Sequence, residues 1–158
     1  MNVRPVTAAD RDWIADAVTT AFGSVRMVSH GEVIEDASLL DGFAVDHDGR
    51  PVGCALVNVV DNDAELVVLV TTYRGAGAGT ALLEAVTERA KQEKWSRLWL
   101  VTSNDNTDAI RMYQRAGWDW VDFRRDAITE ARALKPELPE TGNHGIALRH
   151  EIEFEAPL

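Results

Sequence analysis

A glycine-rich turn in the middle of the chain has the residue types best suited to bind a charged ligand. It follows the apolar run Leu66–Val70 and precedes an amphipathic segment, which predicts a strand, a turn and a helix in that order. Glycines let the backbone approach a ligand closely, and a helix N-terminus attracts anions, most often phosphates. The predicted phosphate-binding residues are Arg74, Gly75, Ala76, Gly77, Ala78, Gly79 and Thr80, among which Arg74 adds a fork of donors.

Other interpretations of this turn stay open on its residues alone. A P-loop requires Gly-Lys followed by Ser or Thr, whereas Thr80 and Ala81 follow the last glycine here. The dinucleotide fingerprint requires a third glycine where Thr80 stands, and it usually lies in a first βαβ unit. The plainest alternative is a turn that starts a helix and binds nothing.

A second segment, Asn106–Trp118, narrows these alternatives. The pattern Arg74-x-x-Gly77-x-Gly79 after a hydrophobic strand resembles the acetyl-coenzyme A (acetyl-CoA) signature of the GNAT acetyltransferase superfamily. Asn106–Trp118 is similar to the family motif N-x-x-A-x-x-x-Y-x-x-x-G-[aromatic]. The chain departs from the family in the loop Val70–Arg74, which lacks the usual proline and is one residue shorter.

This resemblance implies a fold, a co-substrate and a reaction. The fold is mixed α/β, the acyl-CoA N-acyltransferase fold, with a central, mostly antiparallel, splayed sheet and helices on both faces. The co-substrate is acetyl-CoA, and the reaction is transfer of its acetyl group to a primary amine of a small molecule or peptide. Since the sequence contains no nucleophile motif such as G-x-S-x-G, we expect direct transfer in a ternary complex.

The resemblance also implies where the co-substrate lies. Val68, Leu69 and Val70 would meet it, and backbone N–H groups near Leu69 and Val70 would polarise the thioester carbonyl. In the family a bulge splays this strand from its neighbour and frees those groups. Seven residues separate Asn106 from Tyr113, which in a helix places them on one face, about 10 Å apart along the axis. One would contact the pantetheine arm and the other the sulfur.

Two residues are candidates for proton transfer. Tyr113 would protonate the departing thiolate, as the matching tyrosine of the family often does, and the alternative is an ordinary core tyrosine. Glu65 would act as the base through a water molecule, for which burial must raise its pKa; the alternative is an ordinary carboxylate at a strand end. No His, Cys, Asp or Glu constellation at ligand spacing suggests a metal.

The remaining pattern predicts the elements that position these residues. Helices are expected to Phe22, over 77–92, over 106–116 and over 127–134. Strands are expected over 3–6, 25–29, 42–45, 51–60, 65–70, 97–102 and 118–123. A last strand, over 146–154, is expected to bury His150, Ile152 and Phe154 and to expose Glu151 and Glu153. His30 is expected in a solvated loop.

Length, composition and charge limit the number of domains, the kinds of partner and the cellular location that we expect. With 158 residues, of which 46% are hydrophobic, the chain is expected to form a single domain over 1–158. The resemblance implies that this is an N-acetyltransferase domain, with its motif core at 64–118 and a C-terminal extension at 126–158. The net charge of −10 argues against a nucleic-acid partner and modestly favours a cationic acceptor; the alternative is that this charge serves solubility alone. No apolar run suits a membrane, the N-terminus does not resemble a signal peptide, and the single cysteine fits a cytoplasmic protein. Either a monomer or a homodimer is compatible with the sequence.

Two further functions compete with acetyl transfer. A non-catalytic domain could bind acyl-CoA and sense it without turning it over. A purely structural domain would bind no coenzyme A at all.

Overall fold

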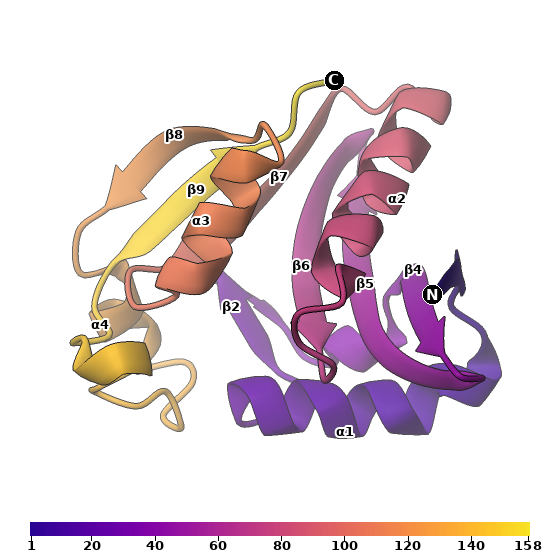
Figure 1. Ribbon diagram of the computed structural model, residues 1–158. Coiled ribbons are helices and arrows are strands. Elements are labelled where there is room, and N and C mark those ends of the chain that lie inside the picture. The colour runs from indigo at the N-terminus through magenta and orange to yellow at the C-terminus, as the bar shows by residue number, and fades with distance from the viewer.

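A seven-stranded sheet with the order β1-β4-β5-β6-β7-β9-β8 runs through the molecule (Figure 1). The computed structural model describes residues 1–158. The strands are β1 (Asn2–Pro5), β4 (Asp41–His47), β5 (Arg50–Val60), β6 (Asp63–Thr71), β7 (Arg97–Ser103), β8 (Asp119–Arg124) and β9 (Glu151–Glu155). Only the β6–β7 pair is parallel, so the sheet is mostly antiparallel, as predicted.

Helices cover both faces of this sheet (Figure 1). The helices are α1 (Arg11–Phe22), α2 (Ala78–Gln92), α3 (Thr107–Arg115) and α4 (Ala127–Ala131), and short 3-10 turns lie at Ala8–Asp10, Ala37–Leu39 and Asn143–Gly145. On one face, Leu82 and Val86 of α2 and Tyr113 of α3 join the larger core cluster. On the other face, Ile14 and Val18 of α1 pack in a second cluster.

A hairpin that the sequence predicted only in part lies on the same side as α1. Its strands are β2 (Met27–Ser29) and β3 (Glu32–Ile34), joined by a turn in which His30 has a φ of 51°. Met27 and Ile34 pack against the α1 cluster, which fixes the hairpin on this face. The sequence predicted a strand over 25–29 but not its partner.

The predicted last strand over 146–154 is wrong in its first half. β9 begins at Glu151, because the preceding residues bond elsewhere. The side-chain oxygen Oδ1 of Asn104 accepts the N–H groups of Arg149 and His150 at 3.0 and 2.9 Å. Ile146 instead closes a turn, with its carbonyl accepting the Gly142 N–H at 2.8 Å.

The N-terminal strand is tied to its surroundings by a charged cluster. The Arg4 guanidinium donates to both carboxylate oxygens of Asp10 at 2.8 Å and to both of Asp46 at 2.7 and 3.1 Å. Asp10 is 5% exposed and also accepts the Thr7 N–H at 2.8 Å. The hydrogen bonds from Arg4 hold the pKa of Asp10 well below its usual range.

The segment after α4 covers the end of α1 and the start of the hairpin. Arg26 donates to the Leu134 carbonyl at 2.5 Å, and Ser24 donates to Glu137 at 2.6 Å. Lys135 is only 2% exposed, and its Nζ has a single polar contact, the Met27 sulfur at 3.9 Å. Burial therefore lowers the pKa of Lys135.

Candidate active site

The candidate site begins where β6 and β7 part. The two strands pair only where Asp63–Glu65 of β6 lies beside Arg97–Trp99 of β7. Beyond Glu65, β7 keeps β9 as its partner on the other side, whereas β6 keeps only β5 (Figure 1). The edge of β6 from Leu66 onward therefore has no strand beside it.

A bulge in β6 accompanies this parting. The register with β5 shifts between Leu56 and Val57, which pair with Val68 and Leu66, so Val67 has no partner. Val67 and Val68 consequently lie on the same face, in the α1 cluster, although they are consecutive. A bulge re-aims the residues after it and ends regular pairing, which is how this sequence opens the sheet.

The backbone of Leu69 faces the opened edge. The Thr72 N–H bonds the Val52 carbonyl of β5 at 2.8 Å, and N–H groups alternate in direction along a strand. Val70, which pairs with Cys54, thus directs its N–H toward β5, whereas Leu69 directs its N–H toward the side that β7 has left. Of the two backbone donors predicted, the register leaves that of Leu69 free.

The glycine turn follows directly at the end of β6. Gly75 and Gly77 both have a φ of 79°, and a Cβ at either position would meet no atom within 4 Å. Gly77 is the N-cap of α2 and offers no side chain to bond the first N–H groups of the helix. Arg74, Ala76 and Thr80 are exposed around them. An anion can therefore reach the free N–H groups at the start of α2.

The first turn of α2 lies against α3. A Cβ on Gly79 would come within 2.9 Å of the Met112 sulfur, so a glycine keeps the two helices close, whereas the Ala78 side chain is buried in the core. Asn106 is the N-cap of α3 with a φ of −82° and a ψ of 57°, outside the helical region. Its amide donates to the Thr102 hydroxyl at 3.0 Å.

Tyr113 is buried in the core cluster, at 6% exposure. Its ring lies 5.4 Å from that of Phe154 and 6.1 Å from that of Trp118, centroid to centroid. Burial raises the pKa of the Tyr113 hydroxyl, so the group keeps its proton at neutral pH. Burial in the core is therefore compatible with a role for Tyr113 as the acid, because a buried hydroxyl stays protonated and a proton donor must be protonated.

Glu65 lies at the last paired position before β6 and β7 separate. It is 9% exposed, and burial raises the pKa of its carboxyl group, with Ser29 and His30 opposing this rise and the nearby charges of Glu151 and Glu32 adding to it. The condition that a base at this position requires, a raised pKa, is therefore met.

The sequence pattern placed three residues of this region of the sheet wrongly. Glu151 and Glu153 are buried, at 4% and 5% exposure, although alternation predicted them to be exposed. His30 is not in a solvated loop: its ring stacks on Trp99 at 4.6 Å, and its Nε2 lies 2.6 Å from Glu153. The hairpin that carries His30 covers this part of the sheet, and no periodicity within β9 could reveal a cover supplied from residues 27–34.

His150, which was expected to be buried by the last strand, lies just before β9 and is half-buried. Its Nδ1 accepts the Asp126 N–H at 2.9 Å, which satisfies the ring within the tail.

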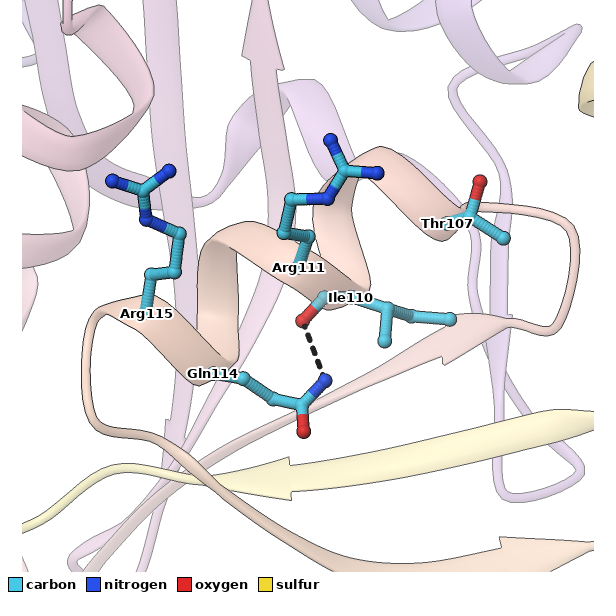
Figure 2. Close-up of a pocket in the computed structure, with 5 residues that line it drawn as sticks. All are labelled: Thr107, Ile110, Arg111, Gln114 and Arg115. Carbon is cyan, nitrogen blue, oxygen red and sulfur yellow. Dashed lines mark hydrogen bonds between the residues drawn. The ribbon is translucent and has the colours of Figure 1, made fainter.

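A shallow hollow of about 500 Å³ lies on the outside of α3 and contains none of the predicted catalytic residues (Figure 2). Arg111 and Arg115 project to one side of the helix, and Gln114 projects to the other. Gln114 folds back to donate to the Ile110 carbonyl at 3.4 Å. The hollow is thus a basic surface of the helix that bears Tyr113.

Two other findings concern the chain as a whole. No helix is both long and apolar enough to cross a membrane. No three or more His, Cys, Asp and Glu side chains are grouped so that they could hold a metal ion.

Comparison with known proteins agrees with this arrangement. Residues 12–118 match the Acetyltransferase (GNAT) family. The chain is 41% identical to YdhI of Bacillus subtilis (strain 168) over 155 residues, covering 98% of this chain and 96% of that one.

Solved structures share the fold at low sequence identity. The IAA acetyltransferase from Bacillus cereus superimposes with a TM-score of 0.75 at 16% identity, covering 99% of both chains. A GNAT family acetyltransferase from Elizabethkingia anophelis, with acetyl-CoA bound, gives a TM-score of 0.69 at 20% identity, covering 99% of this chain and 97% of that one.

The splayed sheet, the glycine turn at the start of α2 and the family match together define an acyltransferase. The chain belongs to the GNAT family of acetyltransferases.

Proposed function

We propose that this protein transfers the acetyl group of acetyl-CoA directly to a primary amine in a ternary complex. One observation carries the proposal: the Leu69 N–H faces the opened edge of β6, and the same strand leads into a glycine turn with free helix N–H groups. A donor for a carbonyl oxygen and a cradle for a pyrophosphate are thus joined by a few residues of one strand.

The residues present fit acetyl-CoA. The space over Gly75 and Gly77, where a Cβ would meet nothing within 4 Å, admits a pyrophosphate against the backbone. Arg74, Ala76 and Thr80 border this space, and Ala78 and Gly79 contribute backbone N–H groups at the start of α2. Val68 and Val70 hold the strand on the α1 cluster while Leu69 presents its backbone, and Asn106 stands at the start of α3.

Three groups of the chain, the Leu69 N–H, the Tyr113 hydroxyl and the Glu65 carboxylate, then take part in the reaction. Bound acetyl-CoA supplies an activated acetyl thioester. The Leu69 N–H stabilises the charge that develops on the carbonyl oxygen as the amine nitrogen attacks. Tyr113 donates its hydroxyl proton to the sulfur as the carbon–sulfur bond breaks, and Glu65 takes the proton lost by the amine through a water molecule.

Replacement of Tyr113 by phenylalanine tests the proposed acid. The chain has two tyrosines, so Tyr73→Phe removes the other phenolic hydroxyl and serves as the matched control. Thiol release from acetyl-CoA is followed with a panel of an alkylamine, a diamine, an amino acid and a short peptide. We expect Tyr113→Phe to lower kcat by about 10²–10⁴-fold and Tyr73→Phe to leave it within about twofold.

The same assay separates the alternatives. Equal kcat values for the two variants would remove Tyr113 from the mechanism. Binding of acetyl-CoA without thiol release for any amine would favour the sensing domain, and no binding at all would favour a structural domain.

A further inference from the structure

The edge strand β8 exposes an unusual amount of apolar side chain. It is the last strand of the sheet and pairs only with β9, so its other edge has no neighbour (Figure 1). Trp120 is 48% exposed, Val121 46% and Phe123 48%, all within a strand of six residues. Outside the ladder with β9, the backbone of Asp119–Arg124 makes no hydrogen bond to another backbone group. An exposed apolar edge of this kind is a place where a further strand can add.

The opposite edge of the same sheet is protected against such addition. Strand β1 has only four residues, of which Arg4 is charged and Pro5 has no N–H to donate. None of the four is a large exposed hydrophobic residue. Strand β8 has no proline and carries two exposed aromatic side chains, so the two edges of the sheet differ in their capacity for association.

A bulge in β8 places these two aromatic side chains on one face. The register with β9 shifts between Trp120 and Asp122, so that Trp120 pairs with Phe154 and Phe123 with Ile152. Phe154 and Ile152 belong to one core cluster, and paired residues of neighbouring strands point to the same face. The Trp120 ring lies 5.7 Å from the Phe154 ring, centroid to centroid, which fixes it from one side. Trp120 and Phe123 therefore form a supported aromatic patch at the free edge.

The charges along this edge suit a second copy of the same chain. Two chains of net charge −10 repel each other over most of their surface, but the segment 119–125 is neutral, since Asp119 and Asp122 are balanced by Arg124 and Arg125. Asp119 and Arg125 are exposed, and neither has an ion pair within the chain, unlike Arg124 and Asp122. Because the acidic end of the segment precedes its basic end, an antiparallel second copy brings Asp119 of each chain to Arg125 of the other.

We propose that the protein forms a homodimer in which the two β8 strands lie antiparallel about a two-fold axis. An axis perpendicular to the sheet keeps equivalent faces together, so Trp120 of each copy packs on Phe123 of the other. Asp119 of each copy pairs with Arg125 of the other, and this self-complementary order of charges favours a second copy over a different protein. The inference goes beyond the proposed function and does not depend on acetyl transfer.

Sedimentation velocity of the protein, over about 1–100 μM, tests this interface, and we expect wild type to be a dimer at the upper end of the range. Trp120→Ala should raise the dimer Kd by about a hundredfold or more, because two central aromatic contacts are lost per dimer. Tyr73→Ala is the matched control, since Tyr73 is an aromatic residue outside β8 that is 45% exposed and stacks on His47. It should change the dimer Kd by less than about twofold.

Charge reversal tests the antiparallel arrangement with two residues whose exposure leaves the fold intact. Asp119→Arg and Arg125→Asp should each raise the dimer Kd by about tenfold, because each creates two pairs of like charges. The double variant restores opposite charges at both ends and should return to within about threefold of wild type.

Three results would overturn the inference. A wild type that stays monomeric throughout the range would leave the edge of β8 to a partner of different sequence. A dimer that Trp120→Ala does not weaken, or that Tyr73→Ala weakens equally, would place the interface elsewhere. A double variant as weak as the single variants would refute the antiparallel pairing.

Discussion

Replacement of Gly77 by alanine separates the cost of backbone strain from the loss of a ligand. Gly77 has a φ of 79°, and a Cβ there would meet no atom within 4 Å, so the methyl group fits sterically in the free protein. The left-handed conformation of a non-glycine residue costs about 1–2 kcal/mol. For a chain of this size, that lowers Tm by about 2–8 °C.

The ligand effect has a different size and origin. Acetyl-CoA at a hundred times its Kd should stabilise the wild type by about 2.7 kcal/mol, or about 5–11 °C. In Gly77→Ala the new methyl group occupies the space in which a phosphate would contact the backbone. We therefore expect the free variant to melt moderately lower and to gain little or nothing from acetyl-CoA.

Gly117 offers a matched control. It has a φ of 84°, its Cβ would meet only Pro157 at 4.0 Å, and it lies just beyond the C-terminal end of α3, the end opposite Asn106. Gly117→Ala should therefore lose a similar amount of Tm but keep the full shift with acetyl-CoA. A thermal melt of the three proteins with and without acetyl-CoA gives both quantities, and an undiminished shift in Gly77→Ala would refute the phosphate cradle.

Three further predictions follow from the charges. Since burial raises the pKa of Glu65, kcat/KM should rise with pH through a value above the ordinary glutamate pKa, and Glu65→Gln should lose that limb; an unchanged pH profile would exclude Glu65 as the base. Lys135→Met should raise stability by about 1 kcal/mol near neutral pH, and since the folded-state pKa of Lys135 is lowered, the gain should shrink as pH rises toward the unfolded-state value; a destabilised variant in urea titrations would contradict this. Asp10→Asn should cost about 1.5–3 kcal/mol at pH 7, because Arg4 holds the pKa of Asp10 low, and this difference should fade as pH drops below about 4; a difference that is constant with pH would be the opposite result.

The elements that carry the motifs could be predicted because their signals are local. The turn at Gly75 and Gly77 lies between a strand and a helix as predicted, and helix α3 ends at Arg115, one residue before the predicted end at 116. The bulge in β6 followed from the family resemblance rather than from the apolar run Leu66–Val70, whose pattern shows no break.

The cover over the charged face of β9 could not be predicted, because it comes from a distant segment. His30 reaches Glu153 only because a three-residue strand pairs with another and docks beside α1. Alternation in β9 distinguished its two faces correctly, but it could not show that the charged face is also covered. Long-range ion pairs with Arg97 and Arg124 make that burial possible, and they leave no signal at the level of neighbouring residues.

The central claim is transfer of an acetyl group to an amine, and a product balance tests it most directly. Purified protein is incubated with acetyl-CoA and an alkylamine such as 1-butylamine, and both the free thiol and the N-acetylated amine are quantified by mass spectrometry. The account predicts equal amounts of the two products, formed only when both substrates are present. Thiol release that is independent of the amine, or bound acetyl-CoA that stays intact with every amine, would contradict it.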